Sequence, residues 1–227
     1  MSKTIVRTIN LSKVYRRGKV NVPALNNVNL QVLSGEIIGI MGPSGSGKTT
    51  LLNLIGGLDR PTSGKIFVDG VDITALGEKD LADYRLRKVG FVFQFYNLIP
   101  TLTALENVEI PMALAGVPKN ERRERAVNLL KMVGLEARAD HKPDELSGGE
   151  QQRIAIARAL ANNPSMVLAD EPTGDLDSKS ALTLMNLIKD LNKKNGQTFI
   201  IVTHDLIVAE RCTKIYAIRD GRIDIQK

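Results

Sequence analysis

Eight consecutive residues carry the strongest pattern in this sequence: Gly42-Pro43-Ser44-Gly45-Ser46-Gly47-Lys48-Thr49. They match G-x-x-x-x-G-K-[ST] at every fixed position. An apolar run at residues 37–41 precedes them, and Leu51, Leu52 and Ile55 give a helical pattern after them. Glycines let the backbone turn its N–H groups inward around a phosphate, and the helix directs its positive dipole end to the same place. The sequence therefore predicts a strand, a phosphate-binding loop and a helix, in that order.

The side chains at the end of this loop suit a nucleoside triphosphate. Lys48 would bring a mobile positive charge to the β- and γ-phosphates, and the Thr49 hydroxyl suits a Mg²⁺ ligand. Thr50 would hydrogen-bond the phosphates nearby. A chance glycine-rich turn is the alternative, but a buried strand before the loop and a helix after it favour the nucleotide site. We therefore expect residues 42–50 to bind a nucleotide.

Two carboxylates end a second apolar run. Residues 166–169 read as a buried strand, and Asp170 and Glu171 follow it directly. In a parallel α/β sheet, ligands gather at the carboxyl ends of the strands. We expect Asp170 to hold Mg²⁺, directly or through water, and Glu171 to polarise or deprotonate the attacking water. A strand that merely ends in polar residues is the alternative, which the complete phosphate-binding loop upstream disfavours.

Strand and helix patterns alternate over much of the chain, which favours a largely parallel sheet covered on both faces. Strands are predicted at residues 4–9, 28–32, 37–41, 66–68, 166–169 and 199–203, and a closing hairpin at residues 215–225. Helices are predicted at residues 150–161 and 178–193, and a further helix between Asn120 as N-cap and Gly134 as its end. Residues 1–227 form one predicted domain, with a helical subdomain at about residues 95–163.

A second element for binding anions is predicted at the start of the helix near residue 150. The segment reads Leu146-Ser147-Gly148-Gly149-Glu150, and a serine with two glycines at a helix start suits an anion. This segment resembles the signature sequence of the ABC transporter ATPases, which usually reads LSGGQ. This sequence departs from that signature at the last position, where it has Glu150 in place of glutamine. Because a carboxylate near a γ-phosphate would repel it, we expect Glu150 to point away from the nucleotide.

The resemblance covers nearly the whole chain and implies roles for further residues. Tyr15 resembles the aromatic residue that stacks on adenine, a core tyrosine being the alternative. Gln94, after Phe91-Val92-Phe93, resembles the Q-loop glutamine that senses Mg²⁺ and water. His204 resembles the switch histidine, which would hydrogen-bond the γ-phosphate and the attacking water. Asp177 resembles the last aspartate of the D-loop.

The resemblance also implies the fold and the assembly. The expected fold is an α/β P-loop NTPase of ABC type, with a mostly parallel core sheet, an antiparallel β subdomain and a helical subdomain. ATP and Mg²⁺ are the expected cofactors. Two subunits would close head to tail over two Mg-ATP molecules. One subunit would supply Lys48, Thr49, Gln94, Asp170, Glu171 and His204, and the other residues 147–150.

One branch of the family is closest in the segment after Gln94. Residues 95–103, Phe-Tyr-Asn-Leu-Ile-Pro-Thr-Leu-Thr, and Glu106-Asn107-Val108 resemble the lipoprotein-releasing and macrolide-exporter ATPases. The branch implies a separate permease with few membrane spans, and export of lipoproteins, peptides or drugs. Leu98, Ile99 and Leu102 would contact a short cytoplasmic helix of that permease, or else pack inside the helical subdomain. A non-transport ATPase that regulates a membrane-bound cell-envelope enzyme remains the alternative.

Composition excludes several other classes of protein. The chain has 227 residues, 43% of them hydrophobic, yet no stretch approaches the ~20 apolar residues of a membrane span, and no signal peptide is expected. A single cysteine, Cys212, favours the cytoplasm, and the permease would hold the protein at the inner face of the cell membrane. The net charge of +6 includes two basic runs, residues 16–19 and 122–125, which are either solvated or attracted to an anionic membrane. No aromatic residue interleaves with them, so nucleic acid is not an expected partner. DNA-repair relatives carry long insertions that this chain lacks.

Overall fold

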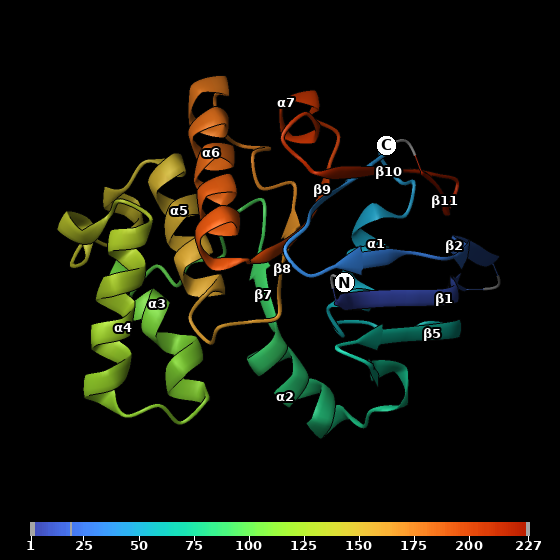
Figure 1. Cartoon of the computed structure of the whole chain (residues 1–227), viewed down its shortest axis with the longest axis horizontal. Helices are drawn as coiled ribbons and strands as arrows, with labels where there is room; N and C mark the ends of the chain where they lie inside the picture. The colour runs from blue at the N-terminus through green and yellow to red at the C-terminus, as the bar shows by residue number, and fades with distance from the viewer. Residues whose placement is uncertain (1–2, 19, 226–227) are drawn as a thin grey trace.

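The computed structural model describes residues 3–18 and 20–225, and within them a six-stranded sheet separates two layers of the molecule (Figure 1). Its strand order is β11-β10-β4-β9-β8-β7. The strands are β4 (Ile37–Met41), β7 (Val89–Val92), β8 (Met166–Asp170), β9 (Thr198–Thr203), β10 (Lys214–Arg219) and β11 (Arg222–Ile225). All neighbours are parallel except β10 and β11, which form the predicted closing hairpin. The mostly parallel core sheet is confirmed.

Successive residues of the central strands enter different cores, because side chains alternate between the two faces of a sheet. In β9, Phe199 and Ile201 enter the core of the helical subdomain, whereas Ile200 and Val202 enter the core that contains the helix at residues 48–55 and the second sheet. Burial on both faces explains why these strands read as continuous apolar runs in the sequence.

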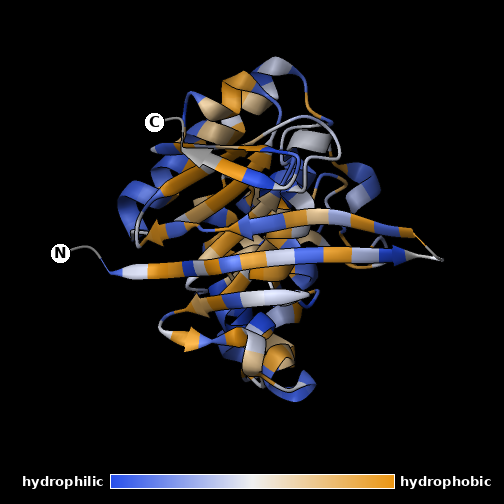
Figure 2. Cartoon of the chain, turned by 90° about the vertical axis from the view of Figure 1, so that its right-hand side faces the viewer, coloured by the Kyte–Doolittle hydropathy of each residue, from blue (hydrophilic) through white to orange (hydrophobic). Residues whose placement is uncertain are grey.

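The second sheet is the antiparallel one that the resemblance implies, with the order β2-β1-β5-β6 and β3 paired to β1. Its strands are β1 (Thr4–Arg17), β2 (Val20–Val28), β3 (Gln31–Leu33), β5 (Ser63–Val68) and β6 (Val71–Asp72). Figure 2 shows β1, the long strand next to the N-terminus, with alternating hydrophilic and hydrophobic residues. Its buried members, Ile5, Val6 and Leu11, share one core with α1 (Lys48–Ile55).

The sequence predicts one strand over residues 28–32, and this prediction is wrong. Val28 ends β2 and Gln31 begins β3. The Thr8 side chain separates them, because its Oγ1 donates to the Val28 carbonyl at 3.0 Å and accepts from the Leu30 N–H at 2.8 Å. A side chain thus replaces the regular ladder, which no local pattern could indicate.

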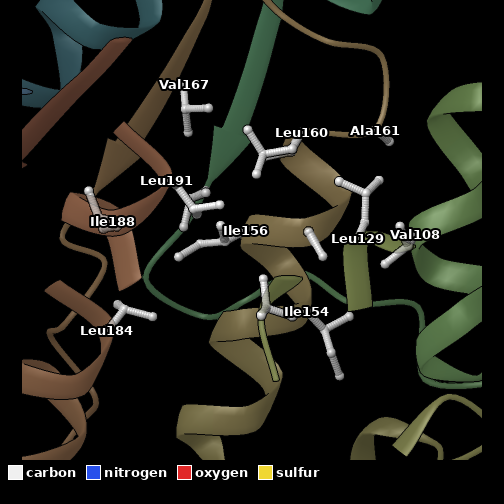
Figure 3. Packing of buried hydrophobic residues seen from close by; sticks show 14 of the residues in the cluster. Val108, Leu129, Ile154, Ile156, Leu160, Ala161, Val167, Leu184, Ile188 and Leu191 are labelled. Atoms are coloured by element: carbon white, nitrogen blue, oxygen red, sulfur yellow. The ribbon is translucent and has the colours of Figure 1, made fainter. Parts of the chain in front are cut away.

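The helices α3 (Ala104–Leu114), α4 (Lys119–Met132) and α5 (Gly148–Ala159) lie on the other face of the six-stranded sheet, together with α6 (Ser178–Asn195). Figure 3 shows how they share one apolar core, in which Ile154 and Ile156 of α5, and Leu160 directly after it, lie between α4 and α6. Partners in this core include Val108, Leu129, Leu184, Ile188 and Leu191. The remaining helices are α2 (Glu78–Lys88) and the short α7 (Leu206–Ala209). None of the helices in the described ranges is long and apolar enough to cross a membrane.

Two helix boundaries test the predicted caps. Asn120 is not the N-cap of α4; Pro118 holds that position, with a φ of −56°. Proline fixes φ near the helical value, so the helix begins at Lys119 and Asn120 falls inside its first turn. Gly134, with a φ of 74°, ends the helix as predicted. The helix near residue 150 begins two residues earlier than predicted, because Ser147 caps it.

The second basic run is partly neutralised on the protein surface. Arg122 Nε lies 3.3 Å from Glu109 Oε2, and Arg123 lies 4.0 Å from the other oxygen of that carboxylate. Both pairs join α4 to α3, which favours the solvated reading of this run. In the first run, Lys19 and the side chain of Arg17 lie outside the described residues.

Candidate active site

The phosphate-binding loop connects β4 to α1, as predicted. Gly47 caps the helix with a φ of 105°, and a Cβ on this residue would lie 2.4 Å from the Ala24 carbonyl oxygen. Only glycine fits there, because both the left-handed φ and the close approach exclude a side chain. The Lys48 ammonium lies within the loop and donates to the carbonyls of Gly42 at 2.8 Å and Pro43 at 3.0 Å. The cation is thereby held at the bend of the loop.

The loop has an unsatisfied polar atom that fits a phosphate. The Ser46 hydroxyl is buried and has no hydrogen-bond partner among the residues that the structure describes. Its backbone is fixed, since Ser46 N–H donates to Pro43 and its carbonyl accepts from Gly221 N–H at 3.0 Å. A buried hydroxyl without a partner costs free energy. This orphan, the Lys48 ammonium and the glycine cradle are therefore compatible with a bound triphosphate.

One hollow of about 670 Å³ brings the predicted elements together. Its volume lies in the usual range for small-molecule and cofactor sites. The predicted site residues that line it are Pro43, Ser44, Gly45, Gly47, Lys48, Thr49, Thr50, Gln94, Glu171 and His204. The loop, the end of β8 and the end of β9 therefore meet in one place, although more than 150 residues separate Pro43 from His204 along the chain.

Thr49, which lines the hollow, lies beside Asp170, which does not belong to the lining set. Thr49 Oγ1 donates to Asp170 Oδ1 at 3.1 Å. Burial, together with the charge of Glu171, raises the pKa of Asp170 above its ordinary value, although the Thr49 hydrogen bond and Lys48 oppose this. A hydroxyl and a poorly solvated carboxylate form the oxygen-donor set that Mg²⁺ prefers. Thr49 and Asp170, two of the three residues predicted as metal ligands, therefore fit a divalent cation.

Glu171 and His204 form a hydrogen-bonded pair. His204 Nδ1 lies 2.9 Å from Glu171 Oε1, and the His204 N–H donates to the other carboxylate oxygen at 3.4 Å. Glu171 has a φ of 46°, and its N–H donates to Val202 of β9 at 2.9 Å. A left-handed φ is uncommon for a residue with a side chain, and such strain is concentrated at functional sites. The strained backbone directs the carboxylate to the end of β9, where the histidine follows.

Gln94 reaches across to the turn after Glu171. Its Nε2 donates to Asp175 Oδ1 at 3.2 Å, and a Cβ on Gly174 would lie 3.0 Å from the Gln94 amide. The glutamine thus packs on the turn that leads to α6, while it also lines the hollow. Asp177, the other acid of this turn, caps α6 by accepting from Lys179 and Ser180 N–H groups.

Tyr15 is not a core residue, since 38% of it is exposed. Its hydroxyl donates to Asp59 Oδ2 at 2.8 Å, and Lys13 Nζ lies 4.8 Å from the ring centroid. Among the described residues, it does not belong to the set that lines the hollow. The core alternative is excluded, and the adenine-stacking role stays a prediction.

The segment Ser147–Glu150 stands apart from the hollow, at the start of α5. Ser147 Oγ accepts from the Glu150 N–H, and the Glu150 carboxylate accepts from the Ser147 N–H at 2.9 Å, which completes a capping box. The nearest neighbours of Gly148 and Gly149 are Tyr96, Leu176 and Ser180. One chain therefore carries two separate elements that suit phosphate.

A residue that the sequence does not single out connects these regions. Gln152 of α5 is fully buried, and its Nε2 donates to the carbonyls of Phe93 at 3.2 Å and Pro172 at 2.6 Å. Phe93 directly precedes Gln94, and Pro172 directly follows Glu171. A polar residue four positions before Ile156, on the buried face of the helix, is the sequence signal that could have revealed it.

Arg158, at the end of α5, holds the segment after Gln94. Its guanidinium donates to the carbonyls of Tyr96, at 2.8 Å, and Asn97. Both residues have a positive φ, 60° and 49°. The end of the helix that Ser147 caps therefore contacts the loop that contains Gln94.

Comparison with known proteins agrees with this geometry. The family described as ABC transporter matches residues 25–174. An uncharacterised ABC transporter ATP-binding protein from Thermotoga maritima is 52% identical, over 98% of this chain and 94% of the relative. The chain belongs to the ABC transporter ATP-binding proteins. A second uncharacterised relative, MJ0796 from Methanocaldococcus jannaschii, is 50% identical over 97% of this chain and 95% of its own length.

Solved structures place the fold in the same family. A dimeric post-hydrolysis state of the ATP-binding cassette MJ0796, bound to ADP and Pi, has a TM-score of 0.90 at 49% identity and covers 98% of both chains. CbiO1 from Clostridium perfringens, part of an ABC transporter complex, has a TM-score of 0.89 at 31% identity and covers 99% of this chain and 88% of its own. The predicted ABC fold is confirmed, and the protein is an ABC ATPase.

Proposed function

We propose that this ABC ATPase binds Mg-ATP between two copies of the chain and uses its hydrolysis to drive a separate membrane permease. The observation that supports the two-copy site is that the two elements suited to bind phosphate, the loop and the start of α5, lie apart on one chain. The hollow joins the loop to Glu171 and His204, whereas Ser147–Glu150 begins a helix elsewhere on the same chain. The dimeric cassette with bound ADP and Pi supports the same arrangement. Residues 1–227 act as a single domain with a helical subdomain at about residues 95–163.

Each side chain of the hollow has a distinct role in this proposal. Lys48 and the loop amides would bind the β- and γ-phosphates, and Thr49, Asp170 and Gln94 would hold Mg²⁺, which would supply neutralisation of the phosphate charge. Glu171 orients the attacking water and accepts its proton. His204 Nδ1 lies 2.9 Å from Glu171 Oε1 and orients that carboxylate. Nε2 can donate to a γ-phosphate oxygen at the same time only in the imidazolium form, in which both ring nitrogens carry protons.

The base of the nucleotide would lie against the antiparallel sheet. The Tyr15 ring is partly exposed, and its hydroxyl donates to Asp59 Oδ2 at 2.8 Å. A partly exposed aromatic ring on β1 offers a surface on which adenine would stack.

The permease would dock on a groove between α2, β7, α3 and α5. This groove has a volume of about 430 Å³, and its lining residues include Leu58, Leu86, Phe91, Pro111, Leu114 and Asn162. Leu114 and the nearby Phe95 are each 72% exposed. Ile99 is also exposed, but Leu98 packs against the helical core, so only Ile99 of these two suits a partner. A short cytoplasmic helix of the permease fits such an apolar groove beside the Gln94 loop.

The permease determines the cargo and the location. The resemblance to lipoprotein-releasing and macrolide-exporter ATPases supports export of lipoproteins, peptides or drugs, with this chain on the inner face of the cell membrane. The alternative, regulation of a membrane-bound cell-envelope enzyme without transport, is distinguished by testing whether the purified complex with its permease moves a substrate.

The first test is the molecular mass of Glu171→Gln with and without Mg-ATP, by size-exclusion chromatography with light scattering. We expect a monomer without nucleotide and a dimer with Mg-ATP, because the variant binds ATP but cannot complete hydrolysis. Glu124→Gln, an exposed change on α4, is the matched control and should not form a lasting dimer. A Glu171→Gln protein that binds Mg-ATP but stays monomeric would contradict the two-copy site.

A further inference from the structure

The Glu150 carboxylate occupies the donors of Ser147. Its Oε2 atom accepts from the Ser147 N–H at 2.9 Å and from the Ser147 hydroxyl at 2.7 Å. These two donors are the groups that a phosphate would use at this helix start. A phosphate of the partner's nucleotide and the Glu150 carboxylate therefore compete for the same hydrogen bonds.

The charge of Glu150 adds to this conflict. Its two hydrogen bonds with Ser147 hold the pKa of Glu150 below its ordinary value, so the group is ionised at neutral pH. A carboxylate beside a triphosphate is repelled strongly where water is excluded. A neutral glutamine at this position would have no such charge. This chain therefore needs a way to neutralise or displace the carboxylate.

Arg138 is positioned to do so. Its Nε lies 3.3 Å from Glu150 Oε1, the oxygen that does not contact Ser147. Arg138 ends a short turn, Glu136–Arg138, whose following residues are tied to the start of α3: Ala139 and His141 accept from the Leu105 and Ala104 N–H groups. The arginine is thus presented from a fixed segment. Its guanidinium also lies 3.2 Å from His141 Nε2.

We propose that Arg138 is a positioning residue that draws the Glu150 carboxylate off Ser147 when the partner's nucleotide arrives. One carboxylate oxygen already contacts the arginine, so only the far end of the side chain needs to move. The movement frees the Ser147 N–H and hydroxyl for the phosphate and leaves the carboxylate paired. This inference rests on the proposed two-copy site, because only there does a nucleotide reach Ser147.

The test is a double-mutant cycle in the Glu171→Gln background, with the dimer dissociation constant in Mg-ATP measured by analytical ultracentrifugation. The four proteins carry no further change, Arg138→Gln, Glu150→Gln, or both. Arg138→Gln should weaken the dimer about threefold per site, and so about tenfold for two sites, which is the range of a partly exposed ion pair. With Glu150→Gln present, Arg138→Gln should change the constant by less than about twofold.

Three comparisons separate this role from a structural one. Glu150→Gln keeps an oxygen that can cap Ser147, so the thermal midpoint of the nucleotide-free protein should stay unchanged while the dimer tightens. Arg138→Lys should restore part of the affinity lost in Arg138→Gln. Added salt should reduce the Arg138 effect, because the ion pair is partly exposed.

The outcomes are distinct. Equal weakening by Arg138→Gln in both backgrounds would mean that the arginine acts on the nucleotide itself, and would overturn the inference while the two-copy site stands. A looser dimer in Glu150→Gln would also overturn it, since the carboxylate would then help binding. No Mg-ATP-dependent dimer in any of the four proteins would overturn the two-copy site and this inference with it.

Discussion

At the scale of single residues, the hydrogen bond between Glu171 and His204 gives the histidine two separable functions. His204→Ala should lower kcat about a hundredfold, because Glu171 loses the donor that orients it and the phosphate loses a contact. His204→Asn can still donate near the place of Nδ1, so it should keep more activity than His204→Ala. Steady-state ATPase kinetics measure this, and a normal kcat in His204→Ala would remove the histidine from the site.

Asp170 gives a prediction for stability. Its raised pKa means that the fold is favoured when the group is protonated, and that this contribution is lost as pH rises through the pKa. At neutral pH the ionised group destabilises the nucleotide-free protein. Asp170→Asn should therefore raise Tm by about 2 °C at neutral pH.

Differential scanning fluorimetry checks this prediction in two ways. The difference in Tm between Asp170→Asn and the parent protein should shrink as the pH is lowered, because Asp170 becomes protonated. Mg-ATP should stabilise the parent protein but not the variant, which lacks the metal-binding carboxylate. A lower Tm in the variant at neutral pH would show that Asp170 stabilises the empty fold.

Several residues of the candidate site could be predicted singly, but not their partners. Asp170 and His204 follow apolar strands directly, so strand ends mark them in the sequence. The Thr49–Asp170 hydrogen bond joins residues 121 positions apart, and Gln152 contacts two separate loops. Such contacts depend on how elements pack, which a local pattern does not contain.

At the scale of elements, α5 connects the segment at its start to the loops on either side of the hollow through Gln152. Gln152→Met keeps the size of the side chain but removes the donor to the Phe93 and Pro172 carbonyls. The Phe93 carbonyl still accepts from the Tyr96 N–H at 3.2 Å, so the Pro172 carbonyl is the one that loses its partner. Burying this unpaired carbonyl should cost about 1–3 kcal/mol of unfolding free energy. The loops with Gln94 and Glu171 would also shift, lowering kcat by about tenfold to a hundredfold.

The matched control is Gln151→Met, one position earlier, where the side chain makes a single hydrogen bond to the Leu146 carbonyl. Chemical denaturation and ATPase assays should separate the two variants clearly. Equal losses of unfolding free energy and kcat in both variants would show that α5 is sensitive to any substitution, and that the hydrogen bonds of Gln152 have no particular role.

Elements buried on both sides were the easiest to predict, because β4, β8 and β9 appear as unbroken apolar runs. The helix α2 was missed because only Leu81 and Tyr84 are buried along its 11 residues. Two apolar contacts among many charges give no helical period. The false N-cap at Asn120 shows that proline geometry can fix a helix start without a side-chain cap.

At the scale of the whole molecule, the groove beside α3 should couple the ATPase to its permease. Leu114→Lys places a charge on an exposed apolar rim without touching the hollow. Basal ATPase activity should stay within about twofold, whereas co-purification with the permease should fall at least tenfold, as expected for loss of an interface anchor. Leu182→Lys, an exposed change on α6, is the control. Unchanged co-purification would exclude this groove as the docking site.

The separation of the P-loop from Ser147 in the folded chain has a consequence for mixtures of two variant chains. In the proposed two-copy site, a Lys48→Ala chain should damage only the site in which it supplies the loop, and a Ser147→Glu chain only the site in which it supplies α5. When the two inactive chains pair with each other, one composite site carries both defects and the other carries none. Random pairing in an equal mixture should thus leave about a quarter of all sites intact. Two chains that are each inactive would complement one another, as two damaged alleles of one gene do when each repairs a different half of a shared site.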